Sequence, residues 1–222
     1  MIQSITKTIS GTILLDGGEL DVSKWAVRPS TKTGSVVSAT GAFKHLSKQH
    51  SLRHLVVGII GPRDATEEQI KAAESVAYQL GGLGITLICG GKSGVMEAAS
   101  RGCKDAGGLL IGILPGSIPS EANDFVGIPL PTGLGEARNM IIAKSSRVLL
   151  AVGGSYGTLS EVAYGLHFSK PVIGLAGAAD VDGVVHVKDA EAATNAALEA
   201  LLQCATSPIS EEGCKITYTA DK

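Results

Sequence analysis

The sequence predicts an α/β protein with a parallel sheet, and three observations support that prediction. Short runs rich in Val, Ile and Leu recur along the chain, as is typical of strands buried on both faces. Segments of roughly 10–15 residues separate these runs and place apolar side chains at helical spacing. Glycine is frequent, with 29 among 222 residues, and pairs of glycines follow several of the apolar runs. We therefore expect a Rossmann-like doubly wound parallel sheet over residues 53–204.

The expected elements of this domain follow in order along the chain. Residues 55–61 (LVVGIIG) form the first strand. Residues 67–80 form the first helix, which we expect to start at the capping box Thr66-x-x-Gln69 and to end at residues 81–82, two glycines. The other strands are expected at residues 85–91, 109–116, 124–131, 147–154, 170–177 and 183–189, and the other helices at residues 94–107, 135–146, 158–169 and 190–203.

The first 52 residues do not follow this alternation, and we expect them to form an N-terminal extension with β character. Residues 6–25 alternate weakly between polar and apolar side chains, and the Asp-Gly-Gly at 16–18 is typical of a hairpin turn. Residues 35–50 fit either a short helix or a linker. In the C-terminal tail, residues 205–222, a strand-like stretch (CKITYTA) is expected to pair with the hairpin. The role of the extension cannot be read from its sequence.

Composition and charge exclude several classes of function. The net charge is −2 and no Lys/Arg cluster stands out, so we expect no nucleic acid partner. No run approaches 18 apolar residues, so we expect no membrane partner. The four cysteines lack C-x-x-C spacing, which is typical of reduced thiols in a cytoplasmic protein, and the five histidines lack the spacing of metal ligands. We expect neither a metal site nor a cofactor that is required for folding.

Four glycine-rich loops, at residues 61–66, 90–94, 115–120 and 153–158, form the candidate ligand site. In an open parallel sheet, ligands bind beyond the carboxyl ends of the strands, where these loops are expected. Glycine lets the backbone approach a ligand, and the N–H groups at the start of the next helix suit a phosphate. The alternative is that the glycines only make tight turns. The candidate phosphate-binding residues in these loops are Gly61, Arg63, Gly90, Gly91, Lys92, Ser93, Gly94, Gly153, Gly154, Ser155, Gly157 and Thr158.

Familiar nucleotide-binding motifs are missing from the loops. A Walker A loop that ended at residues 91–93 (GKS) would need glycine at position 86, which is Thr86. The first strand ends in residues 61–63 (GPR) and not in G-x-G-x-x-G. The loops therefore indicate neither a P-loop nor an ordinary dinucleotide enzyme.

Glu161 has two interpretations that do not exclude each other. With Thr158 at the N-cap and Glu161 three residues later, the pair forms a capping box that would complete a helix start. Glu161 would also face a ligand if Arg138, early in the preceding helix, lies on the same side of the sheet. An arginine and a glutamate above two phosphate-binding loops could bind a nucleotide and stabilise charge at its sugar.

Three stretches of the sequence resemble the LOG-like Rossmann superfamily, to which the label "possible lysine decarboxylase" is often attached. They are CGGKSGVMEAASRG, TGLGEARNMIIAKSSRVLLAVGGSYGTLSE and KPVIGL, and the resemblance covers residues 53–204. Within the superfamily the sequence is most similar to the molybdenum cofactor carrier proteins, which bind a pterin-phosphate cofactor without turning it over. This resemblance implies a binding or carrier protein for molybdenum cofactor or a nucleotide, assembled as a homo-oligomer, either a dimer or a tetramer.

The sequence also resembles the cytokinin-activating phosphoribohydrolases of the same superfamily, which release the base and ribose 5-phosphate from a nucleoside 5′-monophosphate. Their hallmark is an Arg-Lys pair followed by P-G-G-x-G-T-x-x-E. Arg138 and Glu161 match the arginine and the glutamate, whereas Asn139 stands in place of the lysine and Val152 in place of the proline. The resemblance leaves hydrolysis, with Arg138 and Glu161 as catalytic residues, as the alternative function.

The sequence argues against two other functions that are associated with this superfamily or its fold. No lysine stands in a context that suits a pyridoxal Schiff base, so we do not expect a lysine decarboxylase. The DNA-processing protein A family shares this type of fold, but the acidic balance of the chain argues against DNA handling.

Overall fold

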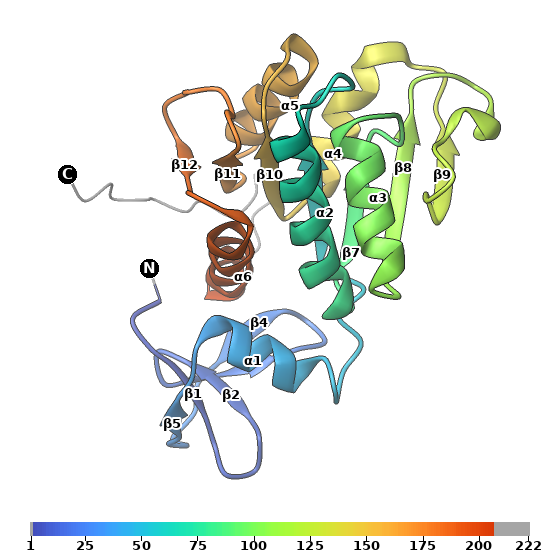
Figure 1. The fold of residues 1–222 in the computed structure, drawn as a ribbon. Helices are drawn as coiled ribbons and strands as arrows, with labels where there is room; N and C mark the ends of the chain where they lie inside the picture. Colours follow the sequence, from blue (N-terminus) through green and yellow to red (C-terminus); the bar gives the residue numbers. More distant parts are fainter. Residues whose placement is uncertain (1, 207–222) are drawn as a thin grey trace.

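The computed structural model describes residues 2–206, which form an α/β domain and a smaller N-terminal module (Figure 1). The domain contains seven parallel strands in the order β12-β11-β10-β6-β7-β8-β9. The chain adds β7 to β9 on one side of β6 and β10 to β12 on the other, so the strand order reverses between β6 and β10. The predicted doubly wound α/β fold is confirmed. The strands are β6 (Val56–Ile60), β7 (Thr86–Cys89), β8 (Leu109–Leu114), β9 (Ile128–Pro131), β10 (Val148–Val152), β11 (Val172–Leu175) and β12 (Val184–His186).

Helices cover both faces of this sheet, because its strands carry apolar side chains on both sides. Along β10, Val148 and Val152 pack into the core under α2, α3 and α6, whereas Leu149 and Ala151 pack into the core under α4 and α5. The described helices of the domain are α2 (Glu67–Gly82), α3 (Val95–Asp105), α4 (Asn139–Ser145), α5 (Tyr156–His167) and α6 (Ala190–Thr206), with 3₁₀ turns η1 (Pro119–Glu121) and η2 (Gly135–Arg138). None of these helices is long and apolar enough to cross a bilayer.

The first helix starts as predicted but ends later. Thr66 and Gln69 form the complete capping box of α2. The expected stop at residues 81–82 is wrong, because both glycines belong to the helix and the left-handed residue that follows it is Gly84, with φ +78°. Gly81 also lies where α2 and α3 pack closely, since a Cβ there would lie 3.1 Å from the Sγ of Cys103, a tight contact.

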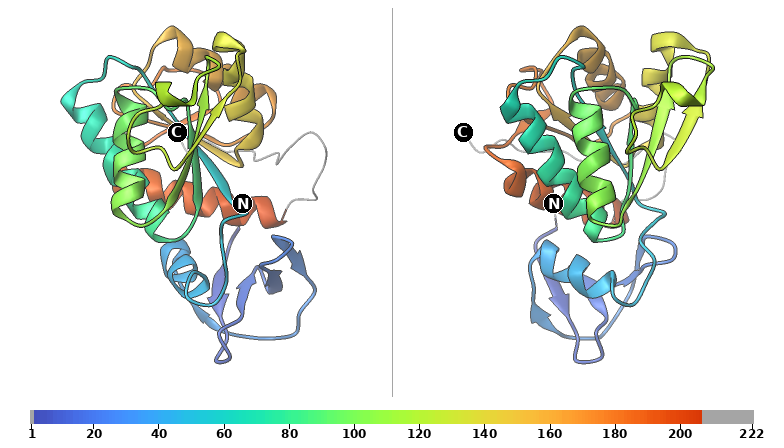
Figure 2. Two further views of the ribbon diagram at one scale, coloured as in Figure 1. Left: turned by 90° about the vertical axis from the view of Figure 1, so that its right-hand side faces the viewer. Right: turned by 45° about the vertical axis from the view of Figure 1, so that its right-hand side comes forward.

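The N-terminal module is an antiparallel sheet with one helix, and it lies at the amino ends of the central strands (Figure 2). Its strands pair in the order β4-β3-β2-β1-β5. The predicted hairpin turn at Asp16-Gly17 joins β2 to β3, and residues 35–50, for which a helix and a linker were both open, contain a helix. The elements are β1 (Ile5–Lys7), β2 (Ile13–Leu15), β3 (Gly18–Asp21), β4 (Ala26–Arg28), β5 (Ser35–Val36) and α1 (Ala39–Leu46).

Trp25 anchors this module to the domain. Its side chain is fully buried, and its Nε1 donates a hydrogen bond of 2.6 Å to the backbone oxygen of Leu201 in α6. Trp25 and Phe43 of α1 share one hydrophobic core with α2 and α6. The predicted pairing of the C-terminal tail with the hairpin lies outside the described residues.

Candidate functional site

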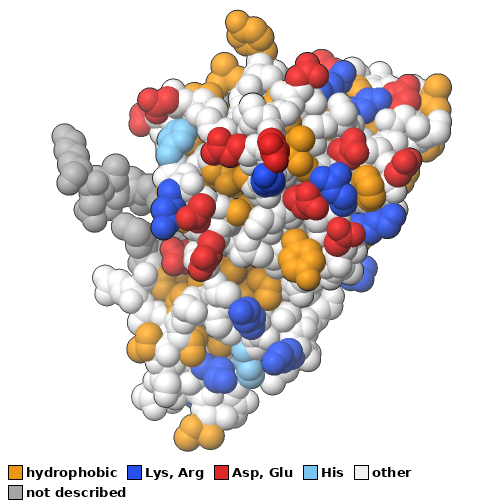
Figure 3. All heavy atoms as spheres, in the orientation of Figure 1, with side chains coloured by type: hydrophobic (Ala, Val, Ile, Leu, Met, Phe, Trp, Pro, Cys, Tyr) orange, Lys and Arg blue, Asp and Glu red, His pale blue; other side chains and the backbone are white. Residues whose placement is uncertain are grey.

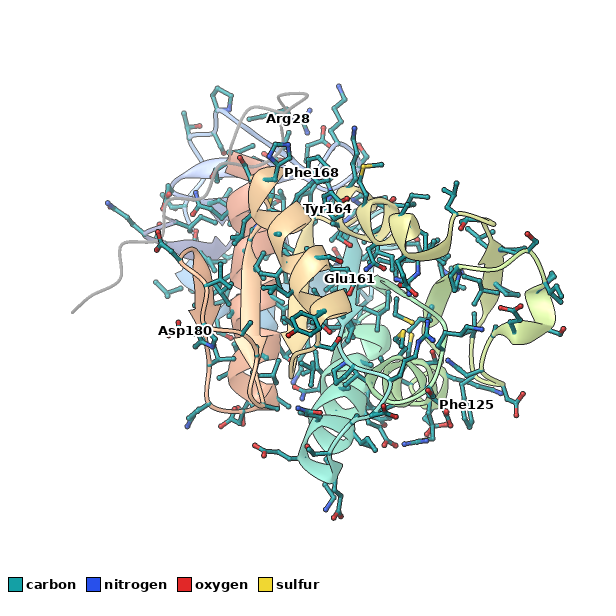
Figure 4. All side chains as sticks on the ribbon, turned by 90° about the horizontal axis from the view of Figure 1, so that it is seen from above. Arg28, Phe125, Glu161, Tyr164, Phe168 and Asp180 are labelled. Carbon is teal, nitrogen blue, oxygen red and sulfur yellow. The ribbon has the colours of Figure 1, made fainter. Side chains whose placement is uncertain are left out.

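A cavity of about 440 Å³ opens at the carboxyl edge of the sheet, between the ends of β6 and β10. This is the point at which the strand order reverses, and in doubly wound sheets the loops on either side of such a point diverge and leave a crevice. Figure 4 looks down on this edge and shows Glu161 of α5 near its centre. The cavity is lined by Ile60, Gly61, Pro62, Arg63, Asp64, Gly90, Met96, Glu136, Arg138, Asn139, Gly154, Ser155, Gly157, Thr158 and Glu161.

The cavity brings together most of the residues that were proposed from the sequence. Two of the four loops, residues 61–66 and 153–158, meet across it, and η2 supplies a third wall. The proposed residues that line it are Gly61, Arg63, Gly90, Arg138, Gly154, Ser155, Gly157, Thr158 and Glu161, whereas Gly91, Lys92, Ser93, Gly94 and Gly153 do not. Six lining residues were not predicted: Ile60, Pro62, Asp64, Met96, Glu136 and Asn139.

The GGKSG loop is held by the protein itself. The Nζ of Lys92 lies 2.9 Å from the Oε2 of Glu121 in η1, and Asn123 donates to the backbone oxygen of Lys92. Gly94 has φ +68°, and a Cβ there would lie 2.2 Å from the backbone oxygen of Arg63. At Gly91 and Gly94, which have left-handed backbones and lie outside the cavity lining, a tight turn accounts for the glycine, and Lys92 is an ion-pairing residue outside the cavity.

Gly154 and Gly157 differ from these turn glycines, because the protein does not need a glycine at either position. A Cβ at Gly154 would meet nothing closer than 3.6 Å, and a Cβ at Gly157 nothing closer than 3.7 Å. Neither has a left-handed backbone. Both line the cavity, so their missing side chains keep open a space that no described protein atom fills.

The start of α5 corrects the prediction for Glu161. Ser155 is the N-cap, with φ −148°, and its side chain accepts the N–H of Thr158. The proposed capping box of Thr158 and Glu161 is wrong, since the helix begins three residues earlier and Glu161 is its sixth residue. The side chain of Glu161 is therefore released from any capping role and points into the cavity. The first N–H groups of α5, at Tyr156 and Gly157, have no partner within the helix.

The side chains of Arg138 and Glu161 form a buried pair at the floor of the cavity. The Nη1 of Arg138 lies 3.1 Å from the Oε1 of Glu161, and the two side chains are only 5% and 7% exposed. The same Nη1 donates to the Oδ1 of Asn139, and Nη2 lies 3.8 Å from the Oε2 of Glu136. A Cβ at Gly90 would lie 2.8 Å from Nη2, so glycine is required there to seat the guanidinium. The expectation that Arg138 and Glu161 lie together is confirmed.

One donor of this cluster is unpaired. The Nε of Arg138 is buried and has no hydrogen-bond partner among the described residues. Nε and Nη2 lie on the same edge of the guanidinium group, whereas Nη1 carries the contact to Glu161. This edge, free apart from the 3.8 Å contact of Nη2 to Glu136, is the one that can hold a phosphate or carboxylate with two parallel hydrogen bonds once Glu136 moves away.

Burial changes the protonation of Glu161. Removal of the carboxyl from water raises the pKa of Glu161 to about 8, and the neighbouring Arg138 opposes this rise without cancelling it. Glu136 adds a smaller upward contribution. Burial therefore favours the neutral form of this carboxyl at pH 7, in which it does not cancel the charge of the Arg138 guanidinium beside it.

Asn139 connects η2 and α4 to the start of α5. Its Nδ2 donates to the Oγ of Ser160 at 2.8 Å and to the backbone oxygen of Gly157 at 3.3 Å. The side chain is buried, and its donors are used within the protein. Asn139 thus positions Arg138 against α5 and does not supply the charge that a lysine would offer to an anion.

The mouth of the cavity carries a second, exposed ion pair. Arg63, in the loop after β6, lies 3.3 Å from Glu136 of η2, and both side chains are more than half exposed. Such a pair contributes little to stability, about 0–1 kcal/mol, so a stronger anion can compete for Arg63.

Comparisons with known proteins place the chain in a family. The SLOG cluster4 family model matches residues 54–206. Among solved structures, the molybdenum cofactor binding protein of Rippkaea orientalis is 39% identical, with a TM-score of 0.61, over 66% of this chain and 95% of that chain. The molybdenum cofactor carrier protein of Chlamydomonas reinhardtii is 41% identical, with a TM-score of 0.60, over 67% of this chain and 98% of that chain.

A curated relative represents the other branch. The probable cytokinin riboside 5′-monophosphate phosphoribohydrolase LOGL3 of Oryza sativa subsp. japonica is 34% identical over 122 residues, which are 50% of this chain and 56% of the rice protein. Together these matches confirm the resemblance to the LOG-like Rossmann superfamily near its molybdenum cofactor carrier branch. The chain belongs to the SLOG cluster4 family.

Proposed function

We propose that this protein binds a phosphorylated heterocyclic small molecule, either molybdenum cofactor or a nucleotide, in the cavity at the carboxyl edge of the sheet, and carries it without turnover. The observation that carries the proposal is the free edge of Arg138, a buried guanidinium whose Nε has no described partner. A phosphate on Nε and Nη2 would satisfy that donor, and the contact between Nη1 and Glu161 would stay intact.

The rest of the cavity suits the same class of ligand. The space beside Gly154 and Gly157 admits a group against the amino end of α5, where free N–H groups and the helix dipole favour an anion. Arg63 stands at the mouth and can reach a second anionic group if it leaves Glu136. Ile60 and Met96 give the opposite wall an apolar surface against which a flat heterocycle can pack.

The alternative is hydrolysis of a nucleoside 5′-monophosphate to free base and ribose 5-phosphate. The buried Arg138–Glu161 pair favours it, because both residues match the hallmark of the phosphoribohydrolases. One feature favours binding instead. Asn139 replaces the lysine of the hallmark and donates its hydrogen bonds to α5.

The decisive experiment measures binding and turnover on the same sample. Purified protein is incubated with AMP and with an N6-modified AMP, and free base is sought by chromatography. Bound ligand is measured by equilibrium dialysis, with nucleotides and with molybdenum cofactor released from a molybdoenzyme. We expect binding without free base. Free base from the wild type but not from Glu161→Gln would establish the hydrolase and reject the carrier.

Two variants test the site itself. Arg138→Gln should weaken binding about 10- to 100-fold, because a charge-assisted hydrogen bond contributes about 1.5–3 kcal/mol. Lys92→Gln is the matched control, since it also removes one cation from a glycine-rich loop but lies outside the cavity. Equal losses in both variants would contradict the proposed site, and so would an absence of binding for every phosphorylated heterocycle tried.

The same proposal includes a cytoplasmic homo-oligomer. Met140 of α4 and Tyr156 and Leu159 of α5 are exposed apolar or aromatic side chains on adjacent helices, which suits contact with a second copy. Cys89 and Cys103 are buried thiols that form no disulfide, which suits a reducing compartment. Analytical ultracentrifugation of the wild type and of Leu159→Lys tests the assembly, and an unchanged monomeric mass in both would reject it.

A further inference from the structure

Charge is distributed unevenly between the two parts of the molecule. From position 22 to position 63 the sequence contains seven Lys or Arg residues and no Asp or Glu. Residues 2–54 carry seven Lys or Arg and three Asp or Glu, whereas residues 55–206 carry 10 and 15. In Figure 3 the acidic side chains lie over the upper, α/β part of this face, and only basic ones lie over the N-terminal module below. The net charge of −2 is therefore the sum over a positively charged module and a negatively charged domain.

Most of the positive charge of the module is free for an external partner. Its three acidic side chains are occupied: Glu19 pairs with Lys32, Asp21 pairs with Arg28, and Asp16 accepts two backbone N–H groups. The cations that form no ion pair with any described residue are Lys7, Lys24, Lys44, Lys48 and Arg53. Lys7 is partly buried, and the other four side chains are exposed.

An apolar side chain protrudes beside these cations. Ile9, in the turn between β1 and β2, is fully exposed. Two residues later, the backbone oxygen of Gly11 lies 2.8 Å from the Nε2 of His45 in α1, so the turn lies against this helix. Lys44 lies in the last turn of α1, and Lys48 follows in the turn after the helix, where its backbone N–H donates to the backbone oxygen of His45. The surface thus combines lysines with a protruding isoleucine, and we call Lys7, Ile9, Lys44 and Lys48 the basic tip.

We propose that the N-terminal module docks the protein on an anionic lipid bilayer through the basic tip, as a surface contact that needs none of the membrane-spanning segments whose absence led us to expect no membrane partner. This inference is independent of the function proposed for the cavity. A negatively charged plane attracts the module and repels the acidic domain, so it holds the molecule in one orientation. Basic side chains together with an inserted apolar one give the two signals that reversible membrane binding requires. The cavity lies at the opposite edge of the sheet from the module, so a docked molecule keeps it open to solvent.

Nucleic acid is the other polyanion that such a surface attracts. The module, however, lacks the exposed aromatic side chains on which the bases of a single strand stack. Its only aromatic residues besides histidine are Trp25 and Phe43, and both are fully buried. No aromatic face is therefore presented on which a base could stack. An exposed isoleucine does not contribute to phosphate binding, whereas it does contribute to insertion between lipid headgroups.

Sedimentation with lipid vesicles tests the proposal on the full chain. We expect binding to vesicles of equal parts phosphatidylglycerol and phosphatidylcholine at 50 mM salt, and none to phosphatidylcholine alone. The double variant Lys44→Gln, Lys48→Gln should weaken binding about 25-fold, because each lysine at an anionic surface accounts for about fivefold. The matched control is Lys71→Gln, Lys188→Gln, which removes the same charge from exposed positions of the α/β domain. We expect it to bind like the wild type.

A second variant separates the contribution of the apolar side chain to vesicle binding from that of the lysines. Ile9→Ser leaves the charge unchanged and should weaken vesicle binding several-fold, with an unaltered melting temperature because nothing packs on this side chain. Three results would overturn the proposal: no sedimentation of the wild type with the anionic vesicles, an equal loss in both double variants, or tighter binding of a single-stranded oligonucleotide than of the vesicles at the same salt concentration.

Discussion

Replacement of Glu161 by glutamine tests the electrostatics of the cavity without any ligand. In the native protein the carboxyl is buried beside Arg138, and its pKa is raised to about 8 from the ordinary value of 4.5. A raised pKa means that the folded protein binds this proton more tightly than the unfolded chain does. The free energy of unfolding therefore falls as the pH rises from about 4.5 to about 8, because the folded state must then bury a charge.

The size of the effect follows from the same values. Each pKa unit corresponds to about 1.36 kcal/mol, so the rise to about 8 makes this carboxyl destabilise the fold by up to about 5 kcal/mol above pH 8, relative to low pH. Glutamine has the same shape, its oxygen can still accept from the Nη1 of Arg138, and it carries no titrating proton. Glu161→Gln should therefore equal the wild type at pH 5 and exceed its stability by several kcal/mol at pH 8.5.

Urea denaturation at pH 5, 7 and 8.5 measures the difference, with the wild type and the variant in the same buffers. Glu121→Gln serves as the control, since this carboxyl lies outside the cavity. The expected result is that the stability curves of the wild type and Glu161→Gln separate as the pH rises. If both curves run parallel, or if the wild type gains stability relative to the variant above pH 7, Glu161 is ionised in the fold and our account of the cavity charge is wrong.

Three further substitutions separate packing from ligand binding. Gly157→Ala should raise the free energy of unfolding by up to about 1 kcal/mol, because alanine favours a helix and its Cβ meets nothing within 3.6 Å. The same substitution should weaken ligand binding at least tenfold in a calorimetric titration. Gly94→Ala should lower the melting temperature in a thermal scan, at a cost of about 2–4 kcal/mol, because its Cβ would lie 2.2 Å from a backbone oxygen in a left-handed residue. Trp25→Phe leaves the backbone oxygen of Leu201 without its buried donor, so it should cost about 1–3 kcal/mol and increase protease cleavage near residues 50–54.

Much of the fold could be predicted because local pattern and tertiary structure agree in the α/β domain. Runs such as residues 55–61 are apolar on both faces, and only a sheet with two helical layers buries them. The ends of helices were harder to predict. Residues 81–82 resemble a stop, but close packing of α2 against α3 also requires glycine, and the two demands cannot be told apart in one sequence.

The candidate site was predicted in part, for a related reason. Arg138 and Glu161 could be paired because both lie near the carboxyl edge of the sheet. The cap of α5 was misplaced because Ser155 and Thr158 are both good N-caps, and only the backbone conformation distinguishes them. Asp64 and Glu136 were missed because their sequence surroundings are those of ordinary exposed acids. A whole-chain net charge likewise could not reveal the basic tip, which a count by segment does.

The geometry of Arg138 bears on whether a family member of this kind turns its ligand over. Hydrolysis requires a carboxyl that is free to act on water or on the sugar, and a cation that responds to charge developing in the transition state. In this protein the Nη1 of Arg138 already contacts Glu161, while Nε is unpaired and Nη2 has only the contact to the exposed Glu136. An anion bound on that free edge leaves the carboxyl paired and protonated, so tight binding need not bring Glu161 into action. Turnover would require a ligand that draws Arg138 away from Glu161, and the hydrogen bonds of Asn139 to α5 resist that movement.

Asn139→Lys would remove those bonds and add a cation, so hydrolysis of AMP by this variant but not by the wild type would identify Asn139 as the residue that keeps the site a carrier.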